Sequence, residues 1–89
     1  MFEIFRTSQF KRDVKKAKRR GKDTDRLKEV IVLLVQGQAL PAKHKDHQLK
    51  GVNKDCRECH IEPDWLLTYR IEANLLQLVR TGSHSDLFT

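Results

Sequence analysis

The spacing of apolar residues near the N-terminus changes from a strand-like alternation to a helical period. Residues Met1–Arg6 alternate between two faces and are rich in β-forming side chains, which predicts a short strand. Ser8 can cap a helix, and apolar residues then recur at helical spacing before Gly21: Phe10, Val14 and Ala17. This pattern predicts a helix with one narrow apolar stripe and a basic surface elsewhere.

A second helical pattern begins at Asp23 or Thr24 and ends at Gly37. Its apolar positions follow the spacing of one helix face: Leu27, Val30, Ile31 and Leu34. The run Val30–Val35 is rich in β-branched residues and could by itself form a buried strand, but the length of the flanking pattern favours a helix. The extra apolar side chains would then need cover from a sheet or from a partner.

The second half of the chain predicts a long connection followed by three strands. Residues 39–52 show no period, and a connection of that length in a compact domain is often a functional loop. Strand patterns follow at hairpin spacing: Lys54–Ile61, Trp65–Ile71 and Leu75–Thr81. The tail, residues 82–89, is short and polar, and we expect Leu87 and Phe88 to attach it to the rest of the molecule.

The element order β-α-α-β-β-β predicts an α+β fold, with two helices from the N-terminal half packed on a small antiparallel sheet. The chain has 89 residues, 38% of them apolar, so we expect one hydrophobic core and a single domain over residues 1–89. In an antiparallel meander, alternate strand ends meet at one edge of the sheet. Five chemically active residues map to that edge: His60, Asp64, Trp65, Arg80 and His84.

Positive charge is concentrated in the first third of the chain. The net charge is +6, from 18 basic and 12 acidic residues; the first 31 residues hold eleven basic and five acidic ones, and seven of each follow. Such a field favours nucleic acid, a membrane surface or an acidic partner, although a solvated helix face is an equal alternative. No apolar run is long enough to span a membrane and the start lacks the order of a signal peptide, so we expect a cytoplasmic protein.

The string Cys56-Arg57-Glu58-Cys59-His60 matches the pattern for covalent haem attachment. The lack of an export signal and of an evident second axial ligand argues against haem. Zinc bound by Cys56, Cys59, His60 and His84 is a stronger alternative, but cysteines three apart on a strand point to opposite faces. A thioredoxin-like redox pair would need a βαβ context. We therefore expect two reduced, partly buried cysteines and no cofactor.

The residues predicted to meet at the sheet edge suit acid–base chemistry on a phosphodiester. Cleavage of RNA by its own 2′-hydroxyl needs a base, an acid and a cation for the phosphorane charge. His60 and His84 can exchange protons near neutral pH, beside Glu58 and Asp64, and Arg80 can hold phosphate oxygens. Two aromatic residues could either stack on a base or pack within the protein: Trp65 and Phe88.

Three segments carry a resemblance to a known family. KDHQLKG (Lys45–Gly51), RECHIEPDWLLTY (Arg57–Tyr69) and RTGSHSDLF (Arg80–Phe88) closely resemble the RelE superfamily of bacterial toxins, in particular its YafQ branch, and the likeness extends over the whole chain. It implies the RelE-like microbial ribonuclease fold and a metal-independent mRNA endonuclease that cuts the codon in the ribosomal A site. It also implies inhibition by a co-expressed DinJ-like or RelB-like antitoxin, with operator DNA contacted only through the antitoxin complex.

The resemblance also assigns roles to residues. It places His47, His60, Asp64 and His84 at catalytic positions, with Glu58 in place of a nearby acidic residue. Arg80 would contact phosphate and Phe88 would orient a base. His84 is the leading candidate for proton transfer, His60 and Asp64 are its partners and His47 assists; which group is base and which acid stays open. Cys56 departs from the family, where an aromatic residue is common.

The basic first helix would lie against ribosomal RNA, through Lys15, Lys16 and Arg19, with salt-sensitive binding. The same surface, with the apolar excess of the second helix, could dock an acidic antitoxin segment that folds on binding. Two other function classes remain open on the sequence alone: a non-catalytic basic RNA-binding or interaction module, and a small zinc or redox protein.

Overall fold

A computed structural model describes residues 1–51 and 54–88, and its elements follow the predicted order with three additions. Position 52, at the end of the predicted connection, and position 89, at the end of the predicted tail, lie outside the described residues. The elements are β1 (Glu3–Arg6), α1 (Ser8–Arg19), α2 (Thr24–Val35), the 3-10 turn η1 (Ala42–His44), β2 (His47–Gln48), β3 (Arg57–Glu62), β4 (Trp65–Glu72), β5 (Leu75–Gly82) and α3 (His84–Phe88).

The α+β class is confirmed, but the sheet is mixed rather than antiparallel. Its strand order is β1-β5-β4-β3-β2, and the four strands from β2 to β5 pair in antiparallel fashion. β1 runs parallel to β5, with Glu3 opposite Leu75 and Arg6 opposite Leu78. A parallel neighbour requires a long crossover, which α1, α2, β3 and β4 supply here. The residue pattern of a single strand contains no information about the direction of its neighbour.

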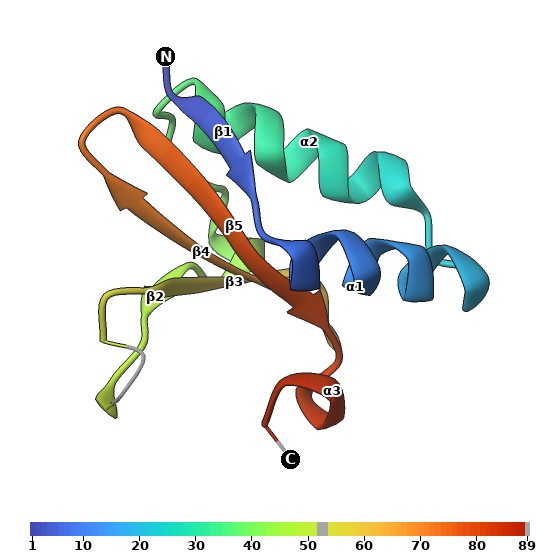
Figure 1. Cartoon of the computed structure of the whole chain (residues 1–89). Helices are drawn as coiled ribbons and strands as arrows, with labels where there is room; N and C mark the ends of the chain where they lie inside the picture. Colours follow the sequence, from blue (N-terminus) through green and yellow to red (C-terminus); the bar gives the residue numbers. More distant parts are fainter. Residues whose placement is uncertain (52–53, 89) are drawn as a thin grey trace.

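The core lies between the sheet and the two long helices, α1 and α2, which share one face (Figure 1). β4 contributes Trp65, Leu67 and Tyr69, and α2 contributes Leu27, Val30 and Leu34, all of them buried. The prediction that the Val30–Val35 run is helical is confirmed. Its apolar excess is only partly covered, because Val32 is 52% exposed. The described residues include no helix long and apolar enough to cross a membrane.

Helix α1 differs from its prediction at the cap and along the stripe. Thr7, not Ser8, is the N-cap: its hydroxyl accepts the Phe10 amide proton at 2.9 Å and donates to the Val79 carbonyl at 2.8 Å. The buried face carries Asp13 between Phe10 and Ala17, whereas Val14 is only half-buried. A carboxylate is stable there because β5 supplies hydrogen-bond donors to it.

The predicted loop and tail both contain regular structure. Within residues 39–51 the chain forms η1 and the two-residue strand β2, whose His47 pairs with Glu58 of β3. The tail folds into α3, which follows the end of β5 and lies below α1 in Figure 1, with Asp86 of α3 bonded to Arg20 next to α1. Residues 39–51 and the tail show no recognisable hydrophobic period, so the sequence did not indicate η1, β2 or α3.

Candidate active site

The predicted site residues gather on and around the sheet face that α1 and α2 leave open. Side chains alternate along a strand, so the residues of β4 between the core positions face this side: Leu66 and Thr68, both buried. Leu87 and Phe88 of α3 and Leu49 beside β2 stand on opposite sides of a hollow of about 250 Å³. Cys56, Thr68, Val79 and Arg80 complete its lining. Of the predicted site residues, Arg80 and Phe88 line this hollow, and the histidines and carboxylates described next lie outside its lining.

His84 and Asp64 are joined by two hydrogen bonds. Oδ1 of Asp64, in the turn between β3 and β4, lies 2.7 Å from Nδ1 of His84 and 3.0 Å from its backbone nitrogen. A carboxylate only accepts, so Nδ1 carries a proton and Nε2 is left for other partners. The hydrogen bonds from the His84 backbone and then from its ring hold the pKa of Asp64 below its usual value. This arrangement fixes the orientation of the imidazole ring.

His60 stands beside His84 at the end of β3. The centroids of the two rings are 5.8 Å apart, and Nδ1 of His60 lies 3.2 Å from the Pro63 carbonyl oxygen, which can only accept. His60 therefore also has Nε2 as its remaining nitrogen. Nδ1 of His44 lies 2.7 Å from the His60 carbonyl oxygen, so η1 supports this strand end. Two imidazoles with orienting partners are thus side by side, as the predicted meander geometry required.

Glu58 is a buried carboxylate on the same strand. It is 4% exposed, its Oε1 lies 3.7 Å from Nε2 of His47, and its Oε2 has no hydrogen-bond partner among the described residues. The ring of His47 is oriented by the Lys45 carbonyl, 2.8 Å from Nδ1. A buried acceptor without a donor lowers the stability of the fold. β2 accordingly brings His47 next to Glu58, and the predicted loop does reach the site.

Arg80 and Phe88 both border the hollow. The Arg80 guanidinium donates from Nε and Nη2 to the two oxygens of Asp13, at 2.9 and 3.1 Å, while its side chain stays 35% exposed. The hydrogen bond with Asp13 raises the pKa of Arg80. The Phe88 ring is 53% exposed, and its centroid is 6.4 Å from that of His84. An exposed ring at this position can stack against a planar group.

Trp65 lies in the core instead of the site. Its side chain is 1% exposed, and Nε1 donates to the Thr81 hydroxyl at 2.9 Å. Of the two alternatives for this residue, packing within the protein is the one observed, because the even parity with Leu67 and Tyr69 directs it toward the helices. Trp65 therefore packs in the core and is not available to stack on a nucleobase.

The basic residues of α1 differ in their freedom. Lys15 and Arg19 are exposed, whereas Nζ of Lys16 lies 3.2 Å from Asp86 of α3.

The two cysteines have different environments. Cys59 is fully buried in the core, where burial raises its thiol pKa to about 12, and Cys56 precedes β3 and lines the hollow. Within residues 1–51 and 54–88, no three His, Cys, Asp or Glu side chains are arranged to hold a metal ion.

Three carboxylates that organise the site were not predicted. Asp13 holds Arg80, Asp86 ties α3 to α1, and Asp46 accepts from Tyr69 Oη at 2.6 Å and from Arg57 at 3.1 Å, which attaches the segment before His47 to the sheet. Two of them left a signal. Asp13 shares the helical spacing of Phe10 and Ala17, and Asp86 follows Ser83 by three positions, as in a capping box.

Comparisons with known proteins agree with this geometry. Residues 2–89 match the family described as the bacterial toxin of type II toxin-antitoxin systems, YafQ. The mRNA interferase toxin YafQ of Escherichia coli K12 is 44% identical over 87 residues, which cover 97% of this chain and 95% of the relative.

Solved structures show the same fold. YafQ in the crystal structure of the E. coli DinJ-YafQ complex superimposes with a TM-score of 0.94 at 42% identity, covering 100% of both chains. A metal-bound toxin from Helicobacter pylori gives a TM-score of 0.93 at 47% identity, covering 99% of this chain and 100% of the other. The fold is thus that of a toxin from a toxin-antitoxin system. Within that class, the chain belongs to the YafQ family.

Proposed function

We propose that this chain is a ribosome-dependent endoribonuclease that cleaves mRNA in the A site and thereby inhibits translation. The observation that carries the proposal is the paired arrangement of His60 and His84, whose ring centroids are 5.8 Å apart, with Asp64 orienting His84. Its relatives are named mRNA interferases, which agrees with RNA as the substrate. The protein would act in the cytoplasm, where translating ribosomes are found.

The proposed reaction is an attack of the ribose 2′-hydroxyl on the adjacent phosphorus. A base removes the 2′-hydroxyl proton, the 2′-oxygen bonds to phosphorus, and the bond to the 5′-oxygen breaks as an acid protonates it. The products are a 2′,3′-cyclic phosphate and a 5′-hydroxyl end. Nε2 of His84 is the leading proton-transfer atom and His60 its partner, because each ring has its Nδ1 engaged elsewhere.

The remaining site residues would bind and orient the substrate. Arg80 is fixed by Asp13 and borders the hollow, so its guanidinium can stabilise charge on the phosphorane. Phe88 can stack on a base beside His84. His47, which is 48% exposed and lies 3.7 Å from the Glu58 carboxylate, would assist at the edge of the site, with Glu58 holding it there. No step in this scheme requires a metal ion.

Binding to the ribosome is assigned to the outer side of α1. Lys15 and Arg19 are exposed there and can contact phosphates of ribosomal RNA, while Lys16 is shared with Asp86. These contacts would place the hollow over the A-site codon. Naked RNA would then be a poor substrate.

An antitoxin is the proposed regulator, as in the complex of E. coli YafQ with DinJ. The exposed side of α2 offers it Val32 and Leu33, bordered by Asp25, Lys28 and Glu29. We expect an acidic antitoxin segment to order itself there, and operator DNA to be contacted only through that complex. Val32→Asp should weaken co-purification with the antitoxin while leaving cleavage intact.

The decisive experiment is primer extension on an mRNA translated in vitro, with and without ribosomes. Wild type should cut at codons only when ribosomes are present, and His84→Ala should be slower by roughly a hundredfold to ten-thousandfold. Gln36→Ala, at the far end of α2, serves as the control. Equal patterns for wild type and His84→Ala would favour a non-catalytic RNA-binding module, and cleavage of naked RNA would remove the ribosome from the proposal.

Metal independence needs its own test, because one relative is a metal-bound toxin. The same assay is run with 1,10-phenanthroline, which removes transition metals but leaves the Mg²⁺ that ribosomes need. Unchanged cleavage supports a reaction carried by side chains alone. Loss of cleavage that added zinc or copper restores would assign the histidines to a metal.

A further inference from the structure

The position of His84 depends on a very short helix. α3 contains five residues, His84–Phe88, and so carries both the leading proton-transfer group and the exposed Phe88 ring. A helix of this length does not persist in water by its own hydrogen bonds. The contacts of α3 with the rest of the protein must therefore fix where the His84 ring stands.

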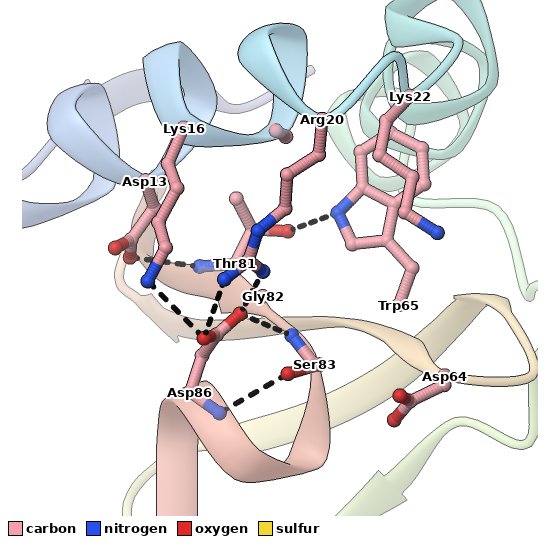
Figure 2. Close-up of a pocket in the computed structure, with 11 residues that line it drawn as sticks. Asp13, Lys16, Arg20, Lys22, Asp64, Trp65, Thr81, Gly82, Ser83 and Asp86 are labelled. Carbon is pink, nitrogen blue, oxygen red and sulfur yellow. Dashed lines mark hydrogen bonds and ion pairs between the residues drawn. The ribbon is translucent and has the colours of Figure 1, made fainter.

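Asp86 makes most of those contacts, on the side of α3 that faces α1. Its Oδ2 lies 2.6 Å from Nη1 of Arg20, and its Oδ1 lies 3.2 Å both from Nη2 of Arg20 and from Nζ of Lys16. Figure 2 shows Lys16 and Arg20 reaching down from α1 to this one carboxylate, at a hollow of about 240 Å³. These charge-assisted bonds lower the pKa of Asp86, first through Arg20.

Asp86 also starts the helix it belongs to. Its Oδ2 accepts the Ser83 amide proton at 2.9 Å, and the Ser83 hydroxyl accepts the Asp86 amide proton at 3.1 Å. This reciprocal pair is a capping box. One side chain therefore defines the first turn of α3 and attaches that turn to the last turn of α1.

The first turn of α3 also packs very closely against the end of β5. A Cβ atom on Gly82 would lie 2.9 Å from Cβ of Asp86, nearer than real side chains approach, so only glycine allows α3 to fold back this tightly on β5. On the opposite side of the same turn, Asp64 holds the ring and backbone of His84. Asp86 and Asp64 thus both hold the first turn of α3 in place.

We infer that Asp86, through its ion pair with Arg20, is a positioning residue that holds His84 in register with His60. The inference rests on the proposed function, since it concerns the same proton-transfer group. Lys16 and Arg20 are 48% and 45% exposed, and ion pairs of that exposure contribute little to overall stability. A displacement of about 1 Å at a reacting group, by contrast, can reduce a rate a hundredfold.

The test compares Asp86→Ala, Asp86→Asn and Arg20→Ala in single-turnover cleavage on programmed ribosomes. Asp86→Ala should lower the rate constant by about tenfold to a hundredfold. Asp86→Asn, which keeps an oxygen for the Ser83 amide, and Arg20→Ala, which leaves Lys16 in place, should lie between it and wild type. Lys18→Ala removes one positive charge from the same turn of α1 and is the matched control.

A double-mutant cycle separates positioning from general damage. In a His84→Ala background, Asp86→Ala should cause no further loss of cleavage, because its effect passes through His84. Ribosome affinity should be the same for His84→Ala with and without Asp86→Ala. Additive losses, or a loss confined to ribosome affinity, would overturn the inference.

Hydrogen exchange gives a readout that needs no catalysis. The His84 amide donates to Asp64, so its exchange should accelerate in Asp86→Ala and Asp86→Asn while Leu67 and Leu76 in the core strands keep their wild-type rates. Unchanged exchange at His84 would overturn the inference. If wild-type protein fails to cleave any RNA, the proposed function is lost, and this measurement still decides whether Asp86 fixes His84.

Discussion

Arg80 on β5 and Asp13 on α1, 67 positions apart in the chain, form a two-pronged ion pair across the edge of the sheet. Asp13 is buried and also accepts the Thr81 amide proton at 3.1 Å and a proton from the Gln9 amide at 3.0 Å. Burial alone would raise the pKa of Asp13, but the bonds from Arg80, Gln9 and Thr81 outweigh it and the pKa lies below its usual value. The guanidinium of Arg80, a residue that lines the hollow, is thereby held in place by Asp13.

Asp13→Ala should therefore affect both stability and cleavage. It leaves the buried Thr81 amide without an acceptor, which should lower the free energy of unfolding by about 1–3 kcal/mol. It also frees Arg80 to rotate, which should slow cleavage. Urea denaturation and single-turnover assays measure the two effects. Gln9→Ala, which removes only one of the donors to Asp13, is the control and should have a much smaller effect on each.

Asp64→Asn should separate catalysis from folding. An asparagine keeps the size of Asp64 but can no longer hold the His84 tautomer by charge, so the cleavage rate should fall roughly a hundredfold or more. Both side chains are largely exposed, at 55% for His84 and 68% for Asp64, so the thermal midpoint should change little. Wild-type cleavage by Asp64→Asn would exclude the pair from the reaction.

Charge reversal at Lys15 and Arg19 should weaken ribosome binding without unfolding the protein. Each lost phosphate contact should reduce the salt dependence of the association constant by about one unit in its logarithmic slope. Lys16 is left unchanged in this test, because its reversal would place a second carboxylate beside Asp86. Co-sedimentation at several salt concentrations provides the slope. Lys28→Glu, on the exposed side of α2, is the control, and equal slopes for all variants would contradict the assignment.

Stability should fall in acid as two poorly exposed carboxylates take up protons. Asp86 and Asp13 both have a folded-state pKa below the ordinary value of 3.8, for Asp86 chiefly because of its bonds with Arg20. A lowered pKa contributes stability above the ordinary value, and that contribution is lost as the pH drops through the folded-state pKa. Unfolding midpoints should therefore decline below about pH 4. The unfolding midpoint of Asp86→Asn should fall less steeply with decreasing pH than that of wild type. Equal slopes would show that protonation of Asp86 does not contribute to the loss of stability in acid.

Much of the fold was predictable because its long elements have strong periodic patterns. The stripe of Leu27, Val30 and Leu34 and the alternation of Leu67 and Tyr69 each specify which face is buried. The meander then brings His60, Asp64 and His84 together from topology alone, and the structure has them in contact. For these residues, local pattern and chain direction contain enough information.

The remaining features depend on contacts between distant parts of the chain. The parallel pairing of β1 follows from how α1 packs against β5, which no local pattern encodes. Trp65 is an aromatic residue of the type that stacks on bases, but the alternation of side chains along β4 places it in the core. Asp13 and Asp86 look like solvated charges in a basic sequence until Arg80 and Arg20 are seen beside them. The spacing of Asp13 and Asp86 places them on a helix face and in a capping box, but nothing local in the sequence identifies their partners.

The buried oxygen of Glu58 has a consequence for the evolution of this protein. Because Oε2 of Glu58 lacks a donor among the described residues, the ligand-free protein gives up part of its stability at that position. Glu58→Leu should accordingly raise the denaturation midpoint while abolishing whatever the carboxylate contributes to cleavage, a stability–activity trade-off. Selection for a sturdier toxin would therefore favour inactive descendants, and keeping an acidic residue at this strand position requires continued selection for toxicity itself.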